Sequence, residues 1–327
     1  MLKQKDRFFL EELQNNFPLS SRPYSEIAKK LRLSERVVMN RVKNLMKRKI
    51  IRYVGGIFDT KRLGVESTLV AMAVPEQRLP EVAGIINAYP QISHNYLRNA
   101  KFNLWFTLSA PNRNKLKNLL SEIRKKTGIN QMLNLSTVRV FKIDARFNLK
   151  TDRSSQTENI DYENKRPEFK DIKVNKKLII ALNKPLGITA RPFLPIAKKL
   201  KIQEDRLLFL LKEYQKNGLL RRLGVILDHQ KIGFKVNGLV AWRVPANRIN
   251  GAAGILRQFP QISHCYQREV YPAWPYNLYT MLHCRDKNSC LLLVKSIARR
   301  AGIKDYRVLF TLKEFKKTKS NLRSILR

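Results

Sequence analysis

The chain has 327 residues, of which 43% are hydrophobic, and this length and composition exclude a disordered chain and predict two or more folded domains. No apolar run approaches the roughly 18 residues of a membrane helix, and the charged opening stretch MLKQKDRFFLEEL lacks the apolar centre of a signal peptide, so a cytoplasmic protein with no membrane segment is expected. The net charge of +40 indicates an anionic partner such as nucleic acid, an anionic membrane or a polycarboxylate, unless the lysines serve only solubility.

The chain is a duplication of one module of about half its length. Four pairs of segments show the repeat: IAKKLRLSE (27–35) with IAKKLKIQE (196–204), IIRYVGGIFDTKRLG (50–64) with LLRRLGVILDHQKIG (219–233), LVAMAVP (69–75) with LVAWRVP (239–245), and QISHNYLR (91–98) with QISHCYQR (261–268). A period of this size predicts two similar domains and not a solenoid of short repeats.

Each copy divides into two parts, which predicts four domains and a linker. The expected boundaries are a helix-turn-helix domain at 1–60, a first ferredoxin-like domain at 61–150, a polar linker at 151–172, a second helix-turn-helix domain at 173–229, and a second ferredoxin-like domain at 230–327. The fold class is therefore α+β, as a tandem duplication.

The first part of each copy predicts a helix, a short turn and a second helix. Ser34 is a candidate N-cap, and apolar residues follow it at helical spacing. The turn residues are Arg32 and Lys201 instead of the glycine common in such turns. The stretch IIRYVGGIFD then predicts one strand of a two-stranded wing.

The second part of each copy predicts the order β-α-β-β-α-β, which is ferredoxin-like. In the first copy ESTLVAMAVP is a strand, LPEVAGIINAYP a helix stopped by proline, and QISHNYLRN with KFNLWFTLSA a hairpin. A helix ending at Gly128 and a last strand, QMLNLSTVRVFKI, complete the unit.

A His-x-Tyr-x-Arg pattern recurs in the second strand of both ferredoxin-like domains. Because side chains alternate along a strand, the three residues of each copy share one face: His94, Tyr96 and Arg98 in the first copy, and His264, Tyr266 and Arg268 in the second. On the neighbouring strands, Trp105 shares a face with Asn103 and Thr107, and Asn277 shares one with Tyr279, Met281 and His283.

This face suits a flat, anionic, metal-bearing ligand. Imidazole ligates iron or moves protons near neutral pH, and guanidinium binds carboxylate in a bidentate manner. The alternative is a half-buried polar interface between domains, in which tyrosine and arginine are ordinary residues.

The helix-turn-helix of the second copy is a poor candidate for reading DNA. The first copy carries basic residues along its second helix (Arg36, Arg41, Lys43, Lys47 and Arg48), whereas the second begins that helix with Glu204 and Asp205, which repel phosphate. A symmetric operator needs two equivalent readers, so DNA binding is not expected.

A helix-turn-helix followed by a β-α-β-β-α-β domain resembles the Lrp/AsnC family of bacterial regulators. SHNYLR…FNLWFTL (93–108), SHCYQR…PAWPYNLYTMLH (263–283), RRLG (221–224) and RYVG (52–55) more specifically resemble the siroheme decarboxylases, an enzyme branch of that family. In that branch two related subunits act as a pair, so one chain with both copies resembles a fused pair, an internal pseudo-dimer that further pairing could make a homodimer.

The resemblance implies a carboxy-lyase reaction. Siroheme loses two acetate carboxyl groups as carbon dioxide and gives 12,18-didecarboxysiroheme, for haem d1 or an alternative route to haem b. No cofactor beyond the iron of the substrate is implied, and no metal belongs to the protein itself. Siroheme is the implied ligand, and later enzymes of haem d1 formation are the implied functional partners.

The resemblance and the chemistry together assign roles to the repeated residues. His264, Tyr266, His94 and Tyr96 are the candidate catalytic groups, as proton donors, and His264 or His94 is a candidate axial contact to the substrate iron. The candidate substrate-binding residues are Arg221, Arg222, Arg268, Arg98 and Arg52 for the carboxylate rim, with Asn277, Tyr279, Trp274, Trp105 and His283 around the macrocycle.

The second copy is expected to hold the working pocket, because it has an extra YPAWP loop, a double arginine and a further histidine, His283. His229 is expected to be solvated in a turn. Cys265 and Cys284 are expected to be packing residues, and three cysteines without a Cys-x-x-Cys pair argue against disulfides or a thiolate zinc site. A ligand-sensing transcriptional regulator and a non-catalytic tetrapyrrole carrier remain as alternatives.

Overall fold

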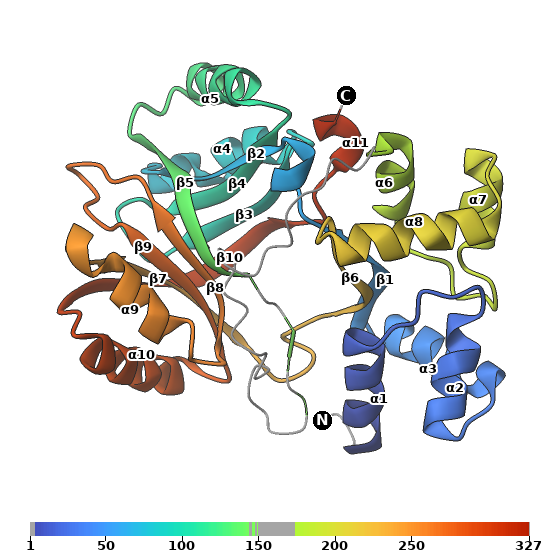
Figure 1. Cartoon of the computed structure of the whole chain (residues 1–327). Helices are drawn as coiled ribbons and strands as arrows, with labels where there is room; N and C mark the ends of the chain where they lie inside the picture. The colour runs from blue at the N-terminus through green and yellow to red at the C-terminus, as the bar shows by residue number, and fades with distance from the viewer. Residues whose placement is uncertain (1–3, 144–145, 148, 150–173, 327) are drawn as a thin grey trace. The chain divides into compact units, whose positions relative to one another are not determined.

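The computed structural model describes the chain except for residues 1–3, 144–145, 148, 150–173 and 327 (Figure 1). The expected linker, 151–172, lies outside the described residues. The chain forms two compact units: unit 1 holds the described residues of 1–63, 146–156 and 165–234, and unit 2 those of 64–145 and 235–327. Unit 1 thus contains both helix-turn-helix parts and unit 2 both ferredoxin-like parts.

Unit 1 consists of two helical triplets and two strands. The elements of the first copy are α1 (Gln4–Asn15), α2 (Pro23–Leu31), α3 (Glu35–Lys47), β1 (Ile51–Phe58) and a 3-10 turn at Lys61–Leu63, and those of the second are α6 (Lys176–Leu182), α7 (Leu194–Leu200), α8 (Glu204–Lys216) and β6 (Leu220–Leu227). The helix-turn-helix elements expected in each copy are therefore α2 with α3 and α7 with α8.

The two helix-turn-helix turns are built alike and without glycine. Arg32 and Lys201 end α2 and α7 in the left-handed region, with φ of 53° and 55°, and the backbone N–H of each donates to carbonyl groups of the last helical turn. Ser34 caps α3, since its hydroxyl accepts from the N–H of Val37 at 3.3 Å, whereas Gln203 makes no side-chain cap on α8.

The expected wing is one sheet shared by the two copies. β1 pairs antiparallel with β6, and Gly55 lies opposite Gly224. The symmetric bonds Asp59 N to Leu219 O (2.8 Å) and Asp228 N to Ile50 O (2.9 Å) close the two ends. At Gly224 a Cβ would lie 2.7 Å from the carbonyl oxygen of Leu13 in α1, so only glycine permits this approach.

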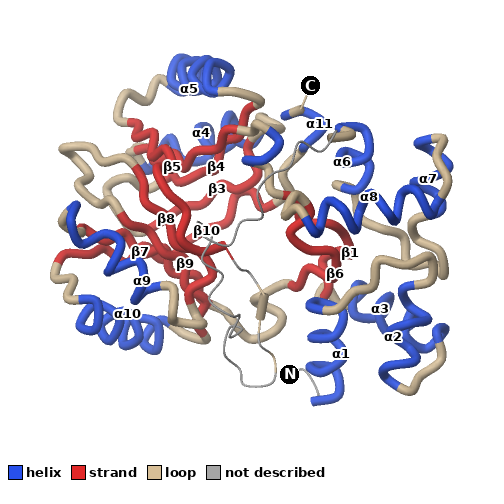
Figure 2. Tube along the Cα trace, viewed as in Figure 1, coloured by secondary structure: helices blue, strands red, loops and turns tan. Residues whose placement is uncertain are grey.

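Unit 2 is an eight-stranded closed barrel with helices on its outside (Figure 2). Its first-copy elements are β2 (Glu66–Met72), a 3-10 turn at Glu76–Arg78, α4 (Leu79–Asn87), β3 (Ile92–Arg98), β4 (Leu104–Ala110), α5 (Arg113–Thr127) and β5 (Met132–Ile143). The second-copy elements are β7 (Val236–Arg243), a 3-10 turn at Ala246–Arg248, α9 (Ile249–Leu256), β8 (Ile262–Arg268), β9 (Leu278–Cys284), α10 (Lys287–Ala301) and β10 (Asp305–Lys317), followed by α11 (Leu322–Ile325).

The predicted order β-α-β-β-α-β is confirmed in both copies, and the last strand of each joins the two halves. The barrel order is β10-β3-β4-β2-β5-β8-β9-β7. The first half of β5 pairs with β2 and its second half with β8, while β10 pairs first with β7 and then with β3. Each copy therefore completes the sheet of the other.

Hydrophobic side chains fill three layers of unit 2. The faces of the two sheets that meet the helices hold Leu104, Phe106 and Leu108 under α4 and α5, and Leu278 and Leu282 under α9 and α10, as strand alternation predicts. The third layer lies inside the barrel and is rich in aromatic rings: Phe102, Trp105, Trp274, Tyr276 and Tyr279.

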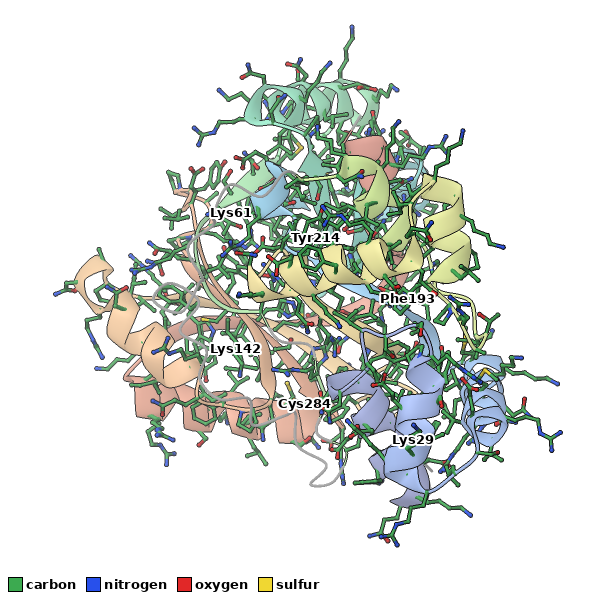
Figure 3. All side chains as sticks on the ribbon, turned by 45° about the vertical axis from the view of Figure 1, so that its right-hand side comes forward. Lys29, Lys61, Lys142, Phe193, Tyr214 and Cys284 are labelled. Atoms are coloured by element: carbon green, nitrogen blue, oxygen red, sulfur yellow. The ribbon has the colours of Figure 1, made fainter. Side chains whose placement is uncertain are left out.

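Two lysines tie the crossing strands to the helices. Lys142 on β5 donates to the carbonyl oxygens of Arg257 (3.0 Å) and Phe259 (3.1 Å), just after α9 (Lys142 is labelled in Figure 3). Lys316 on β10 donates in the same way to the carbonyl oxygens of Asn87, the last residue of α4, and of Tyr89, at 2.7 and 2.8 Å. Both cations satisfy carbonyl groups at helix C-termini, where positive charge is favoured.

No helix in the described part of the chain is both long enough and apolar enough to cross a membrane.

Candidate active site

The His-x-Tyr-x-Arg residues of the first copy form a stack on one face of β3, which we call the first ladder (His94, Tyr96 and Arg98). The rings of His94 and Tyr96 lie 6.0 Å apart at 34°, and the Arg98 guanidinium lies 5.4 Å from the Tyr96 ring. Asn95, between them, points the other way and donates to Asn87 of α4 at 3.1 Å. The alternation predicted for this strand is confirmed.

The second ladder (His264, Tyr266 and Arg268) repeats this stack on β8. Its imidazole and phenol rings are 5.9 Å apart and closer to parallel, at 24°, and the Arg268 guanidinium lies 4.9 Å from the Tyr266 ring. All four rings of the two ladders are partly exposed. Each ladder thus combines two partly exposed ring-bearing residues with one guanidinium group.

The arginines of both ladders are held by backbone and hydroxyl oxygens. Arg98 is 3% exposed and donates to Leu309 O at 2.8 Å, and Arg268 donates to Leu135 O (2.8 Å) and Thr137 Oγ1 (3.0 Å). Neither has a carboxylate within ion-pair distance among the described residues, and the Nε of each is buried without a hydrogen-bond partner.

Burial without a counter-ion makes these cations costly. It lowers the pKa of Arg98 to about 10 and also lowers the pKa of Arg268. Buried guanidinium groups normally pair with an acid. These two are therefore suited to receive carboxylates from a ligand.

A β-bulge at the start of each ladder brings a serine to the histidine. The register advances by two residues on β3 but by one on β4 between Ile92 and His94, and the same shift occurs on β8 between Ile262 and His264. Ser93 Oγ lies 2.8 Å from His94 Nδ1, and Ser263 Oγ lies 2.8 Å from His264 Nδ1. The Nδ1 atom of each ladder histidine is thus engaged by a serine hydroxyl.

The second ladder has a further histidine behind its serine. Ser263 Oγ lies 2.9 Å from His283 Nε2, and His283 Nδ1 lies 2.8 Å from Asn237 Oδ1. The residues at these two positions in the first copy are Ser109 and Ser67, whose hydroxyl groups bond to each other at 2.8 Å. The expected site residue His283 is thus joined to the second ladder through Ser263.

The strand opposite each ladder differs between the two halves. On β10, Lys317 lies opposite His94 and Glu314 opposite Tyr96, and their charged groups are 3.6 Å apart. On β5, Ile143 lies opposite His264 and Val140 opposite Tyr266. Paired residues in an antiparallel sheet share a face. The first ladder therefore has charged neighbours and the second has apolar ones.

Both ladders begin at the same rim of the barrel. Every neighbouring pair of strands is antiparallel, so β3 and β8, four positions apart in the closed order, run in the same direction. His94 and His264 lie near the start of these strands, and both arginines lie at their ends. The pseudo-twofold axis of the barrel relates the two ladders.

The aromatic residues expected to contact the macrocycle are enclosed inside the barrel. Trp105 is 1% exposed, Trp274 7% and Tyr279 1%. The two indole rings pack at 5.7 Å and 62°, and the Trp274 N–H donates to the Tyr279 hydroxyl at 2.9 Å. Tyr279 also lies 5.9 Å from the Arg268 guanidinium. Trp105 lies opposite Tyr96 of the first ladder, and Tyr279 lies opposite Tyr266 of the second. These aromatic side chains therefore pack beside both ladders, and their contact with a macrocycle stays a prediction.

Asn277 is engaged with the backbone of the barrel. Its amide donates to Val244 O at 2.7 Å and accepts from Val244 N at 3.1 Å, and Asn103 makes the same pair with Val74. The repetition of this arrangement in both copies reflects a structural bridge between strand ends. The structure does not bring the Asn277 side chain to the ladders.

The three arginines expected to anchor the substrate rim from the wing lie in unit 1. Arg221 pairs with Asp59 at 2.9 Å, and Arg222 lies opposite Ile57 across the β1–β6 sheet. Both Arg52 and Arg222 lie close enough to Tyr53 to lower the pKa of its phenol, although burial, the larger effect, raises it. These arginines gather on one small sheet.

Two predictions about non-ladder residues have opposite outcomes. Cys265 is fully buried on the helix side of β8, and burial raises the pKa of its thiol to about 12, which confirms that it packs and faces away from His264. His229, expected to be solvated, is only 6% exposed, so that prediction was wrong. Its turn folds back through the bond from Phe234 N to His229 O at 2.8 Å, which buries the residue.

Neither a metal cluster nor a cavity at the end of β7 includes a ladder residue. In the described ranges, no three His, Cys, Asp or Glu side chains are grouped to hold a metal ion. A cavity of about 500 Å³ lies where β7 ends and β10 begins and is lined by Arg243, Arg248 and Lys304. Arg248 is engaged with the carbonyl groups at the end of α10, and no ladder residue lines the cavity.

The second helices of the two helix-turn-helix parts both begin with a paired glutamate. Glu204 pairs with Arg191, but Glu35 stands at the same position in the first copy and pairs with Arg22 in the same way. A glutamate at this position therefore does not distinguish the two copies. Asp205, which replaces Arg36, is the difference that remains.

Sequence reasoning missed the serines and the residues of the opposite strands. The serines were detectable, because both copies read Ser-His at the start of the ladder. Lys317, Glu314, Ile143 and Val140 were not, because only the cross-copy register places them beside the ladders.

The fold and the paired ladders define a class: a fused Lrp/AsnC-type protein with two helix-turn-helix parts and two ligand-binding domains. The family model of the AsnC-like ligand binding domain matches residues 62–142 and 231–316, and that of the siroheme decarboxylase NirDL-like HTH domain matches 6–52 and 175–221. The chain belongs to the siroheme decarboxylase family.

Relatives of known name span the whole chain. It is 32% identical to siroheme decarboxylase of Hydrogenobacter thermophilus, over 95% of this chain and 92% of that one. It is 30% identical to the siroheme decarboxylase NirDL subunit of Paracoccus denitrificans, over 95% of each chain. The siroheme decarboxylase alpha subunit of Desulfovibrio desulfuricans matches 45% of this chain at 42% identity over 84% of its own length, as expected for one half of a fused pair.

Two crystal structures of the siroheme decarboxylase NirDL share the fold. One is 29% identical, with a TM-score of 0.73 over 98% of this chain and 96% of that one. The other, in co-complex with an iron-uroporphyrin III analogue, is 27% identical, with a TM-score of 0.74 over 99% and 97%.

Proposed function

We propose that this chain is a siroheme decarboxylase that removes two acetate carboxyl groups of siroheme as carbon dioxide. The observation that carries the proposal is the pair of ladders. Each joins a partly exposed imidazole and phenol to a guanidinium that has no carboxylate partner among the described residues. Siroheme is an iron macrocycle fringed with carboxylates, and its acid groups are the complement of these guanidinium groups.

The site must bind the carboxylates that stay on the substrate and promote the loss of the carboxylate that reacts. In the step that loses carbon dioxide, the bond between the methylene and the carboxyl carbon breaks and leaves its electron pair on the methylene carbon. One proton then completes the methyl group, so each turnover consumes one proton. Arginines hold the carboxylates that stay, while the reacting one is favoured to lose its charge where the surroundings are apolar.

The ladder histidines are the proposed proton donors. Imidazole is protonated to a useful extent near neutral pH, and such a donor typically contributes 10²–10⁴-fold to a rate. The serine on Nδ1 orients each ring so that Nε2 is directed to the ligand. Tyr96 and Tyr266 lie beside these rings, with centroid distances of 6.0 and 5.9 Å, and are the second candidates for proton transfer. His264 or His94 is also proposed as an axial contact of the substrate iron.

The second ladder is proposed as the main reaction site. Ile143 and Val140 lie opposite it, whereas Lys317 and Glu314 lie opposite the first. A carboxylate beside Lys317 is stabilised in its charged form, which opposes decarboxylation. The first ladder is thus better suited to hold a carboxylate that stays. Arg52, Arg221 and Arg222 are proposed as further rim contacts.

Anaerobic incubation of the purified chain with siroheme, followed by mass spectrometry, tests the function. Two successive losses of carbon dioxide are expected, with an intermediate that has lost one. Unchanged siroheme together with tight binding to a DNA palindrome would instead support a ligand-sensing regulator. Unchanged siroheme that stays tightly bound, without DNA binding, would support a tetrapyrrole carrier.

A further inference from the structure

The second ladder continues into a chain of hydrogen bonds that crosses three strands. From His264 Nδ1 on β8 it passes to Ser263 Oγ (2.8 Å), then to His283 Nε2 on β9 (2.9 Å), and from His283 Nδ1 to Asn237 Oδ1 on β7 (2.8 Å). All three distances are those of well-formed hydrogen bonds. We call these four residues the relay.

We propose that Ser263 and His283 pass a proton to His264 while His264 protonates the substrate carbon. The proposal rests on the proposed function, since it needs a reaction that consumes protons. His264 is the catalytic group in it, and Ser263 and His283 act through His264.

Each link in the relay can both give and take a proton. A serine hydroxyl has one hydrogen and two lone pairs, and an imidazole has a nitrogen on each side. The hydroxyl proton of Ser263 has two acceptors within reach, His264 Nδ1 at 2.8 Å and Met281 O at 3.2 Å, and the relay uses the nearer one. Asn237 binds the far nitrogen of His283 and thereby sets the orientation of its ring.

Protons move along the relay from His283 through Ser263 to His264, and each proton lost by one group is gained by the next. As the carbon–carbon bond breaks, the His264 Nε2–H proton moves to the methylene carbon. His264 Nδ1 takes the proton of the Ser263 hydroxyl, and Ser263 Oγ takes the Nε2 proton of a cationic His283. The products are carbon dioxide, a methyl group, a neutral His264 with its proton on Nδ1, and a neutral His283. Before the next turnover His264 Nε2 takes one proton from solvent, and the Nδ1 proton returns through Ser263 to His283.

The surroundings favour transfer along this path. The residues paired with the two histidines across the strands are Ile143 from β5, Met281 from β9 and Asn237 from β7, and none of these side chains titrates. Within the relay, His283 is the group that can carry the positive charge, because serine and asparagine side chains do not titrate in this pH range. In the first half, Ser109 and Ser67 bond to each other at the equivalent positions, so no second imidazole stands behind Ser93.

Single-turnover measurements on the full chain with siroheme, under anaerobic conditions, test the relay. We expect His283→Gln, which can hydrogen-bond but cannot carry the proton, to slow carbon dioxide release roughly 10- to 100-fold, as for other residues that support a functional histidine. Siroheme affinity should change less than about 2-fold. Ser263→Ala should act like His283→Gln, Ser263→Thr should recover most of the rate, and the solvent deuterium isotope effect should fall in the slow variants.

The matched control is Ser109→Ala, because Ser109 occupies the position in the first half that His283 occupies in the second. It should keep the wild-type rate. A wild-type rate in His283→Gln, or an equal loss in Ser109→Ala, would overturn the relay. If His283→Gln folds poorly, as thermal melting would show, Ser263→Ala and Ser263→Thr decide the question by the same criteria.

A second measurement separates failure of the relay from failure of the function. With only four histidines in the chain, nitrogen NMR can follow each imidazole in the substrate-free protein. We expect His264 and His283 to titrate as a coupled pair and Ser263→Ala to uncouple them. Coupled titration in a wild-type chain that releases no carbon dioxide would refute the function but not the coupling, whereas active protein with independent titrations would refute the relay alone.

Discussion

The two ladders have the same residues but different neighbours. Duplication has kept imidazole, phenol and guanidinium at equivalent positions on β3 and β8, together with the bulge and the serine. The first ladder faces Lys317 and Glu314, and the second faces Ile143 and Val140 and has His283 behind its serine. A residue pattern therefore does not by itself define a site, because the residues on the neighbouring strands set its charge and its access to protons.

The largest expected effect comes from removing one ladder histidine at a time. We expect His264→Ala to slow decarboxylation by about 10²–10⁴-fold, because it removes the proposed proton donor, and His94→Ala to slow it less. Thermal melting of both variants should stay close to that of the wild type, since both rings are partly exposed. Mass spectrometry of both carbon dioxide losses measures the effect, and equal losses in the two variants would mean that both ladders carry out the chemistry.

Substitution of a ladder arginine should weaken siroheme binding without lowering the stability of the fold. Arg268→Met or Arg98→Met should weaken siroheme binding at least 30-fold, about 2 kcal/mol, because a carboxylate of the substrate loses its buried partner. Stability should not fall at neutral pH, because the change removes a buried cation that has no carboxylate partner among the described residues. Absorbance titration and thermal melting check the two effects. Normal affinity with a large loss of stability would make the arginines purely structural.

Placing a charged residue opposite the second ladder should make its surroundings resemble those of the first ladder and slow the reaction. Ile143→Lys would place a cation opposite His264, as Lys317 stands opposite His94. We expect a roughly tenfold slower reaction, from a Coulomb cost of about 1–2 kcal/mol in a partly solvated site. The control is Ile143→Met, which keeps the side chain apolar. Equal rates for the two variants would show that the charge of the opposite strand is unimportant.

The last expected effect is on stability and not on the reaction, beside the first ladder, where Thr318 N donates to Ser93 O at 2.8 Å. Burial lowers the pKa of the next residue, Lys319, from 10.5 to about 8. The unfolded chain then binds the proton more tightly, so the free energy of unfolding should rise by about 2–3 kcal/mol between pH 8 and 10.5 and stay at its lower level below pH 8. Lys319→Met should be more stable at pH 7 and should lack this rise, as urea unfolding at several pH values would show.

The sequence alone determined the duplication, the element types and the faces of the ladders. Repeats, caps and the alternation of side chains are local properties, so Ser34, Gly128 and the His-x-Tyr-x-Arg strands could be placed without coordinates. The resemblance of the same strands to one family also came from contiguous residues. The expected helix-turn-helix and β-α-β-β-α-β parts were found for the same reason.

Only the tertiary structure decided what stands next to what. β1 pairs with β6, β5 with β8 and β10 with β3, and each pairing joins residues from different copies. Such contacts depend on register between distant segments, which no local pattern encodes. For this reason the sequence placed Trp105 and Trp274 on a binding face, whereas closure of the barrel encloses them, and it did not identify Ser263 and His283 as parts of one hydrogen-bonded chain.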